Sequence, residues 1–161
     1  MLEKKLQDFL TRNNGLNLLR IDPELVYLDK EYSFRGGRVD ILAVKNGFPV
    51  AIELKAKNYS SSQVAGQIIN YLNFLKNKNG SVYLVAPKIK PGIISTLREY
   101  SNTRFFEFDE KLHFYEINEA NKNKKFFFFK IPEYHSNTIQ EYVRTPIARL
   151  MSKGIQRILK L

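Results

Sequence analysis

The sequence predicts an α/β domain in which a mixed central sheet is flanked by helices. Three observations support this prediction. Helical and strand-like segments alternate along residues 2–117, the short run 81–87 is almost wholly apolar, and an Asn-Gly pair separates two apolar segments. A wholly apolar run is typical of a strand that is buried on both faces, and Asn-Gly is the strongest short signal for a β-hairpin. Alternating helices and strands indicate a mixed α/β core.

Composition and charge narrow the functional classes. The 161 residues are enough for one domain with a hydrophobic core. No apolar run approaches the roughly 20 residues that span a bilayer, and the N-terminus lacks the apolar core of a signal peptide, so we expect a cytoplasmic protein and no membrane partner. With no cysteine and only two histidines, we expect any metal to have oxygen ligands. The net charge of +10 favours nucleic acid as partner; a merely soluble basic protein is the alternative.

The first predicted element is an amphipathic helix over residues 2–13. Its apolar residues recur at helical spacing, and they are Leu2, Leu6, Phe9 and Leu10. Turn residues at 13–17 end it. A connector then begins at Asp22-Pro23 and leads to a short apolar piece at 26–28.

The second predicted element is a β-hairpin over residues 37–57, turning at Asn46-Gly47. A two-residue type I′ turn needs positive φ at both central positions, which Asn and Gly tolerate. In that register Lys45 pairs with Phe48. A loop of three to five residues is the alternative, and it would shift the pairing of the two strands.

Two acidic residues meet in the two-residue register. Counting back from the turn places Asp40 opposite Glu53, with Cβ atoms about 4.5–5.5 Å apart. Lys55 shares their face of the sheet because side chains alternate along a strand. Two like charges in an apolar setting repel each other, and a divalent cation such as Mg²⁺ removes the conflict. A buried charge cluster without chemistry is the alternative.

The remaining elements up to residue 117 complete the predicted core. They follow a polar loop at 58–62 that carries helix N-cap candidates. We predict a helix at 62–77, a buried strand at 81–87, a helix at 90–100 and a hairpin at 104–117 that turns near 109–111.

Five residues then suggest a family. Asp40, Glu53 and Lys55, the last two within "VAIELKAK", resemble the motif of the PD-(D/E)XK nuclease superfamily. Gln67 and Tyr71 resemble the Q-x-x-x-Y motif of its RecB-like branch. The proline that usually precedes the first aspartate is absent, since Arg-Val stands there.

A closer resemblance is to the catalytic domain of archaeal NucS/EndoMS-type endonucleases. "LEKKLQDFLTRN" is similar to the opening helix of that domain, where a glutamate joins the site, and Glu3 is the matching position. "GGRVDILAV" and "SVYLVAPKIKPG" also look like this family, and the similarity covers about residues 1 to 115. It implies a restriction-endonuclease-like core at 1–120, and a Mg²⁺- or Mn²⁺-dependent deoxyribonuclease with a role in DNA repair.

The resemblance also implies residue roles. Asp40 and Glu53 would hold the metal together with the backbone carbonyl of Leu54. Lys55 would orient the attacking water or stabilise charge on the phosphate. Glu3 could point into the same site, or could be a solvated acid that suits the start of a helix.

Further residues are predicted to support catalysis or contact DNA. Gln67 and Tyr71 share a helix face and could bridge Lys55, a water and a phosphate; a polar rim beside the core is the alternative. Arg38 could touch phosphate or form an ion pair. Gly37, with its neighbouring glycine, would let the backbone approach DNA, or could mark a bulge.

Residues 121–161 are predicted to form a C-terminal extension, with a strand and a basic helix, packed on the same domain. Arg149, Lys153 and Arg157 recur every four residues. This helix could lie along a DNA backbone, or could pack into a homodimer with its basic stripe exposed.

Three functions compete. The leading one is a DNA endonuclease, for which branched, flap or mismatched DNA are candidate substrates. A RecB-like DNA exonuclease is the second, and it would need a DNA end. A nucleic-acid-binding module that keeps the fold but cleaves nothing is the third, and the intact Asp40, Glu53 and Lys55 argue against it.

Overall fold

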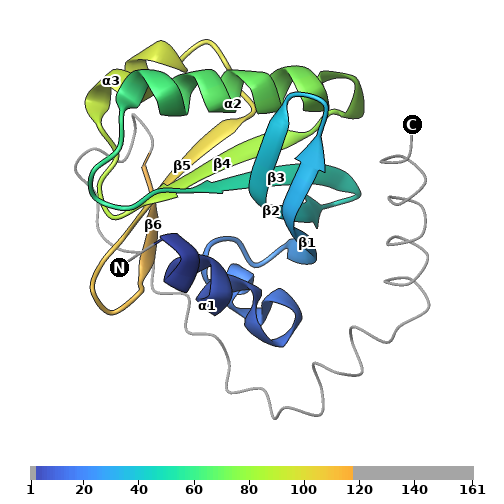
Figure 1. Ribbon diagram of the computed structural model, residues 1–161. Helices are drawn as coiled ribbons and strands as arrows, with labels where there is room; N and C mark the ends of the chain where they lie inside the picture. The colour runs from blue at the N-terminus through green and yellow to red at the C-terminus, as the bar shows by residue number, and fades with distance from the viewer. Residues whose placement is uncertain (1–2, 118–161) are drawn as a thin grey trace. The chain divides into compact units, whose positions relative to one another are not determined.

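The computed structural model describes residues 3–117, which form a six-stranded sheet with helices on both faces (Figure 1). The strands lie in the sheet in their order along the chain. Strands β1 to β3 are antiparallel, β4 is parallel to both β3 and β5, and β6 is antiparallel to β5. The predicted α/β class with a mixed sheet is confirmed. The predicted extension at 121–161 lies outside the described residues.

The N-terminal helix forms as predicted. α1 (Glu3–Gly15) buries Leu6 and Leu10 in a core cluster against one face of the sheet. Its helical geometry breaks at Asn13 and Asn14, whose φ angles are 53° and 55°. Asn enters the left-handed region more easily than most residues. The predicted end of the helix at the turn residues 13–17 is therefore confirmed. The short connecting 3-10 helices of the described chain are η1 (Leu16–Arg20) and η2 (Lys76–Lys78).

The antiparallel half of the sheet contains β1 (Leu25–Phe34), β2 (Gly37–Lys45) and β3 (Phe48–Leu54). β1 is much longer than the apolar piece predicted at 26–28. It lies at the edge of the sheet, and most of its residues are exposed or half-buried. An edge strand tolerates polar side chains, so hydrophobic periodicity did not mark its full length.

The predicted turn between β2 and β3 is confirmed. Asn46 and Gly47 have φ angles of 51° and 85°, as a type I′ turn requires. Pairing runs from Lys45–Phe48 back to a last pair next to the acidic residues, Ile41 with Ile52. The longer-loop alternative is therefore excluded.

The parallel half begins after a crossover helix. Its elements are α2 (Ser61–Leu75), β4 (Ser81–Ala86), α3 (Pro91–Thr96), β5 (Thr103–Phe108) and β6 (Phe114–Glu116). α3 ends earlier than predicted. The hydroxyls of Ser95 and Thr96 both donate to the carbonyl of Gly92, and such local hydrogen bonds compete with a continuing helix.

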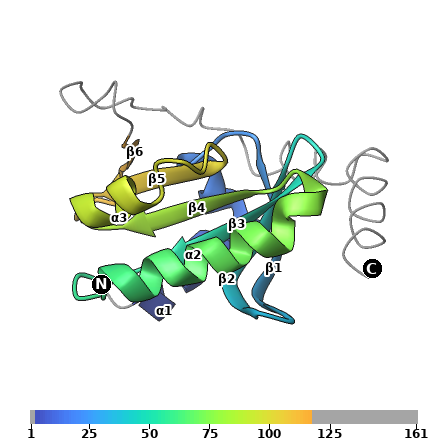
Figure 2. The ribbon, with the colours of Figure 1, turned by 90° about the horizontal axis from the view of Figure 1, so that it is seen from above.

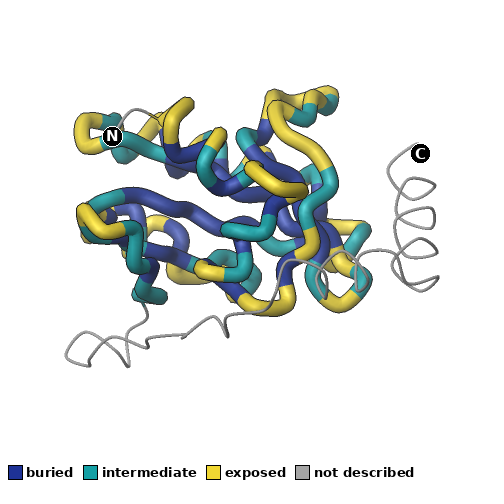
Figure 3. The backbone as a smooth tube through the Cα atoms, turned by 90° about the horizontal axis from the view of Figure 1, so that it is seen from below, coloured by how far each residue is buried: buried dark blue, intermediate teal, exposed yellow. Residues whose placement is uncertain are grey.

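The two faces of the sheet have different helical covers. α1 lies against one face, whereas α2 and α3 lie against the other (Figures 1 and 2). Ile41, Ile52 and Leu54 belong to the core cluster on the α1 side. Because side chains alternate along a strand, Asp40 and Glu53 point toward α2. Most residues of the central strands β2, β3 and β4 are buried, and the buried parts of the described chain are dark blue in Figure 3. No helix within residues 3–117 is long and apolar enough to cross a bilayer.

Candidate active site

The two acidic residues come together where β2 and β3 separate. The β2–β3 ladder ends at Ile41–Ile52, one step before Asp40 and Glu53. Beyond it, Asp40 Oδ2 accepts a hydrogen bond from the backbone N–H of Leu54 at 2.8 Å. The carboxylate of one strand thus bonds to the backbone of the next strand. The predicted juxtaposition of Asp40 and Glu53 on the α2 face follows from this geometry.

Lys55 joins the pair as predicted. Its Nζ lies 2.5 Å from Glu53 Oε1, and the Glu53 side chain is only 2% exposed. The backbone N–H of Lys55 donates to the carbonyl of Val85, which fixes the residue at the end of β3. Burial, the largest single influence, lowers the pKa of Lys55, but the charge and hydrogen bond of Glu53 together with the charges of Glu3 and Asp40 outweigh it, so the net pKa is raised. The lysine is therefore a cation at neutral pH.

The carboxylates of Asp40 and Glu53 repel each other. Burial raises the pKa of Glu53, and the nearby charge of Asp40 raises it further, against the lowering effect of Lys55. Burial likewise raises the pKa of Asp40. Two adjacent acids, one buried and one half-buried, that each disfavour ionisation fit a hard divalent cation, which prefers carboxylate and carbonyl oxygens. Within residues 3–117, no group of three or more His, Asp or Glu side chains is placed to hold a metal ion, so such a cation would rely on this pair and backbone or water oxygens.

Tyr71 connects α2 to the same pair. Its hydroxyl lies 2.8 Å from Glu53 Oε2 and 2.7 Å from the carbonyl oxygen of Arg38. Burial and the charge of Glu53 raise the pKa of Tyr71, so the hydroxyl keeps its proton and acts as the donor. One helix residue thus contacts both β2 and β3, while the predicted bridge from Tyr71 to Lys55, a water and a phosphate stays a prediction.

Glu3 and Gln67 lie beside Lys55. The Oε1 atom of Glu3 accepts from the backbone N–H of Ala56 at 3.0 Å, so the start of α1 is attached to the end of β3. A hollow of about 660 Å³, here called the α2 groove, is lined by Glu3, Lys55, Gln67 and several residues between 58 and 70. The structure therefore places Glu3 and Gln67 on the lining of the hollow that also contains Lys55, and the predicted bridge from Gln67 to Lys55, a water and a phosphate stays a prediction.

The predicted DNA contacts at the start of β2 have structural roles. Arg38 forms an exposed ion pair with Glu31 at 3.6 Å, which was one of the two readings of the sequence. Gly37 has a φ of 153° and pairs with Phe34 at the end of the β1–β2 hairpin. This conformation favours glycine, and it is no bulge. Contact with DNA stays a prediction for both residues.

The remaining predicted contacts are those of the C-terminal helix. Arg149, Lys153 and Arg157 lie outside the described residues, as does the predicted dimer surface.

Gln7 is a site residue that the sequence reading missed. Its side chain is buried, and its Nε2 donates to the backbone carbonyl of Asp40 at 2.7 Å. Gln7 stands four residues after Glu3 in α1, so both side chains share one helix face. In the sequence, the only indication of this role was a polar residue, Gln7, next to the apolar stripe of the first helix. Two bonds from one helix thus hold the strands that carry the acids.

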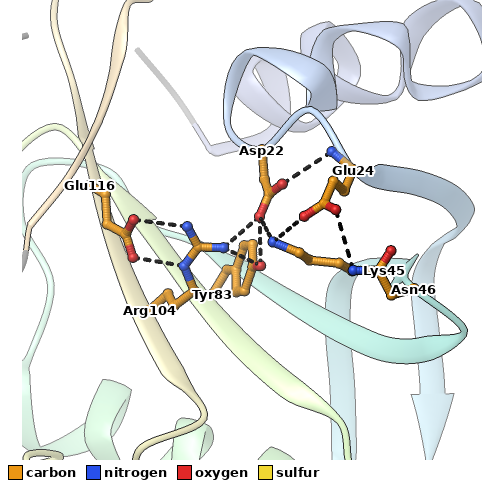
Figure 4. Close-up of polar contacts among 7 residues, drawn as sticks. All are labelled: Asp22, Glu24, Lys45, Asn46, Tyr83, Arg104 and Glu116. Atoms are coloured by element: carbon orange, nitrogen blue, oxygen red, sulfur yellow. Dashed lines mark hydrogen bonds and ion pairs between the residues drawn. The ribbon is translucent and has the colours of Figure 1, made fainter. Parts of the chain in front are cut away.

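A second buried polar cluster lies on the α1 side of the sheet (Figure 4). Asp22 Oδ2 accepts from Lys45 Nζ at 2.8 Å, from the Tyr83 hydroxyl at 2.9 Å and from Arg104 at 2.5 Å. Arg104 also forms a two-pronged pair with Glu116. Each charge has an opposite partner, so this cluster holds the strands together and leaves no charge for catalysis.

Comparisons with known proteins indicate one family. A family model described as the endonuclease NucS C-terminal domain matches residues 2–127. No curated protein sequence gives a significant match.

Three solved structures share the fold. The repair endonuclease from Pyrococcus abyssi is 23% identical with a TM-score of 0.57, over 66% of this chain and 46% of that one. The EndoMS–dsDNA2 complex is 21% identical with a TM-score of 0.54, over 64% and 42%. EndoMS in its apo form is 20% identical with a TM-score of 0.53, over 66% and 46%. The chain thus matches less than half the length of each, and at these identities the likeness establishes the fold.

Proposed function

The chain belongs to the endonuclease NucS C-terminal domain family, and from this premise we propose that it is a DNA endonuclease that requires Mg²⁺ or Mn²⁺. It would hydrolyse phosphodiester bonds at a PD-(D/E)XK site formed by Asp40, Glu53 and Lys55. The observation that carries this proposal is the pair of buried Glu53 and half-buried Asp40, both with raised pKa values, with Lys55 at 2.5 Å from Glu53. Such an arrangement is costly for a purely structural cluster, but it suits a cation site.

Each residue has a role in this proposal. A divalent cation held by Asp40, Glu53 and the carbonyl of Leu54 would polarise the scissile phosphate and lower the pKa of a water. The ammonium of Lys55 orients the attacking water or stabilises charge on the phosphate. Tyr71 holds Glu53 in place through its hydroxyl. Glu3 and Gln67 line the groove where substrate enters.

DNA is the proposed substrate for two reasons. The chain carries a net charge of +10, and positive charge favours a phosphate backbone. One of the structural neighbours is described as a complex with double-stranded DNA, and another as a repair endonuclease. Structure-specific cutting of branched, flap or mismatched DNA, and a role in repair, are part of the proposal.

Cleavage assays on DNAs of defined shape test the proposal. End-labelled linear, nicked, flap and four-way DNA, and a closed circular plasmid, are incubated with the full chain in Mg²⁺, Mn²⁺ or EDTA. We expect cutting with either metal and none in EDTA. The Asp40→Ala variant should bind DNA but leave it uncut.

The same assay separates the competing functions. An exonuclease needs an end, so a plasmid that stays intact while linear DNA is degraded would replace the endonuclease with an exonuclease. DNA that is bound but never cut in either metal would make the protein a binding module. Undiminished cutting by Asp40→Ala would remove Asp40 from the site.

A further inference from the structure

The α2 groove has a lining that phosphate binding does not explain. Four carboxamide side chains contribute to it: Asn58, Gln63, Gln67 and Asn70. Lys55 is the one cation among the lining residues in the described chain, and it is already paired with Glu53. The lining thus offers little positive charge to a phosphate backbone, whose binding depends on Lys and Arg.

Carboxamides match nucleobases better than phosphates. Each Asn or Gln offers a donor and an acceptor on one planar group, as the edges of the bases do. Asn58, Gln63 and Asn70 are exposed in the described chain, so their side chains are accessible from the groove. Protein sites that recognise unpaired bases use hydrogen bonds to the same edges.

The size and place of the groove limit what it can hold. Its volume of about 660 Å³ is in the range of sites for small ligands, which is the size class of a single nucleotide. Lys55 belongs both to the groove lining and to the cluster with Glu53. A nucleotide in the groove would therefore be a close neighbour of the phosphate that is cut.

We propose that the α2 groove binds the base of one unpaired nucleotide adjacent to the scissile phosphate. This inference rests on the proposed nuclease function and adds to it the surface that would recognise an unpaired base next to the cut. The carboxamides of α2 and of the loop before it contact the base edge, while the acids and Lys55 act on the phosphate.

Gly66 offers a way to fill the groove without disturbing the fold. It lines the groove from the middle of α2 and is exposed, and a Cβ built on it meets no atom within 4 Å. A leucine there should favour the helix while it occupies the groove. Gly92 is the matched control, because it is an exposed helical glycine in α3 with equally open space and does not line the groove.

The experiment compares wild type, Gly66→Leu and Gly92→Leu in the full chain. Single-turnover cutting is measured on flap DNA in which an abasic residue is placed, one position at a time, around the cut. We expect Gly66→Leu to cut at least tenfold more slowly and Gly92→Leu to stay within twofold of wild type. One abasic position should slow wild type by a similar factor and have no further effect on Gly66→Leu.

A binding measurement in EDTA makes the test independent of cleavage. Fluorescence anisotropy with a short single strand and with a blunt duplex should show that Gly66→Leu weakens the single strand alone. Asn70→Ala, which removes a carboxamide without filling space, should weaken it in the same direction. Circular dichroism confirms that each variant is folded.

Several results would overturn the inference. These are an unchanged single-strand affinity in Gly66→Leu, equal losses for single strand and duplex, or wild-type cutting that no abasic position slows. A wild-type protein that cuts no DNA would instead refute the nuclease proposal, and the binding measurement would still decide whether the groove takes a base.

Discussion

At the scale of single residues, the buried and half-buried carboxylates of Asp22, Asp40 and Glu53 occupy two opposite environments. Asp22 is surrounded by donors from Lys45, Tyr83 and Arg104. Asp40 and Glu53 have fewer donors and repel each other, and burial raises the pKa of both. The first environment stabilises the fold, whereas the second costs stability at neutral pH, as catalytic sites commonly do.

Replacing Asp40 by Asn should separate activity from stability. The amide oxygen can still accept from the N–H of Leu54, while the negative charge that repels Glu53 is gone. We expect DNA cleavage to fall more than about 100-fold, since loss of a metal ligand exceeds the effect of an outer partner. In metal-free buffer, the melting temperature should be no lower than that of wild type. A variant that keeps its activity, or that melts many degrees lower, would contradict this account.

Replacing Asp22 by Asn should destabilise the protein in a pH-dependent way. Burial raises the pKa of Asp22, but the hydrogen bonds from Lys45, the N–H of Glu24, Tyr83 and Arg104 outweigh it, so the net pKa is lowered. A lowered pKa means that the carboxylate stabilises the fold above its unfolded pKa of about 4, and that this contribution is lost as pH falls through the folded pKa.

Urea unfolding at two pH values measures this effect. At pH 7, Asp22→Asn should lose about 3 kcal/mol, as expected when one member of a buried ion cluster is removed. Below pH 4 the difference between the variant and wild type should shrink. A difference that is the same at both pH values would assign the loss to packing.

At the scale of elements, two helices on opposite faces reach the same pair of strands. Gln7 of α1 bonds to the backbone of Asp40, and Tyr71 of α2 bonds to Glu53 and to the backbone at Arg38. The position of each acid therefore depends on both layers of helices. This arrangement explains why polar residues interrupt the apolar faces of α1 and α2.

Replacing Tyr71 by Phe tests the contribution of α2. The ring still packs against Phe34 at 5.7 Å between centroids, so the core should be kept while the hydroxyl is lost. We expect a loss of about 1–3 kcal/mol in the free energy of unfolding, because a buried acceptor loses its donor. The cleavage rate should fall about 10–100-fold, as for an outer partner of a metal ligand. A normal rate at saturating Mg²⁺ would show that Tyr71 acts only on stability.

Part of this arrangement was predictable from local chemistry. Asn46-Gly47 predicted the turn, the turn predicted the register, and the register predicted that Asp40 and Glu53 share a face, all of which the strand pairing supports. The length of β1, the early end of α3 and the role of Gln7 were not predictable in this way. Each depends on tertiary neighbours, namely a position at the sheet edge, competing side-chain bonds and a backbone carbonyl 33 residues away.

At the scale of the whole molecule, charge should govern the affinity for DNA. The chain has 26 Lys and Arg residues against 16 Asp and Glu. Binding that releases counterions weakens linearly on a log–log plot of affinity against salt concentration. We expect DNA affinity, measured by fluorescence anisotropy in EDTA, to fall about tenfold or more between 50 and 200 mM NaCl. An affinity that does not change with salt would contradict a backbone contribution to binding.

The central claim is that Asp40 and Glu53 share one divalent cation. Crystals soaked in Mn²⁺ and measured at the manganese edge test it most directly, because anomalous scattering locates the metal itself. We expect an anomalous peak within about 2–2.3 Å of a carboxylate oxygen of each residue, and no such peak in crystals of Asp40→Asn. A peak elsewhere, or none at this pair in a protein that cuts DNA, would contradict it.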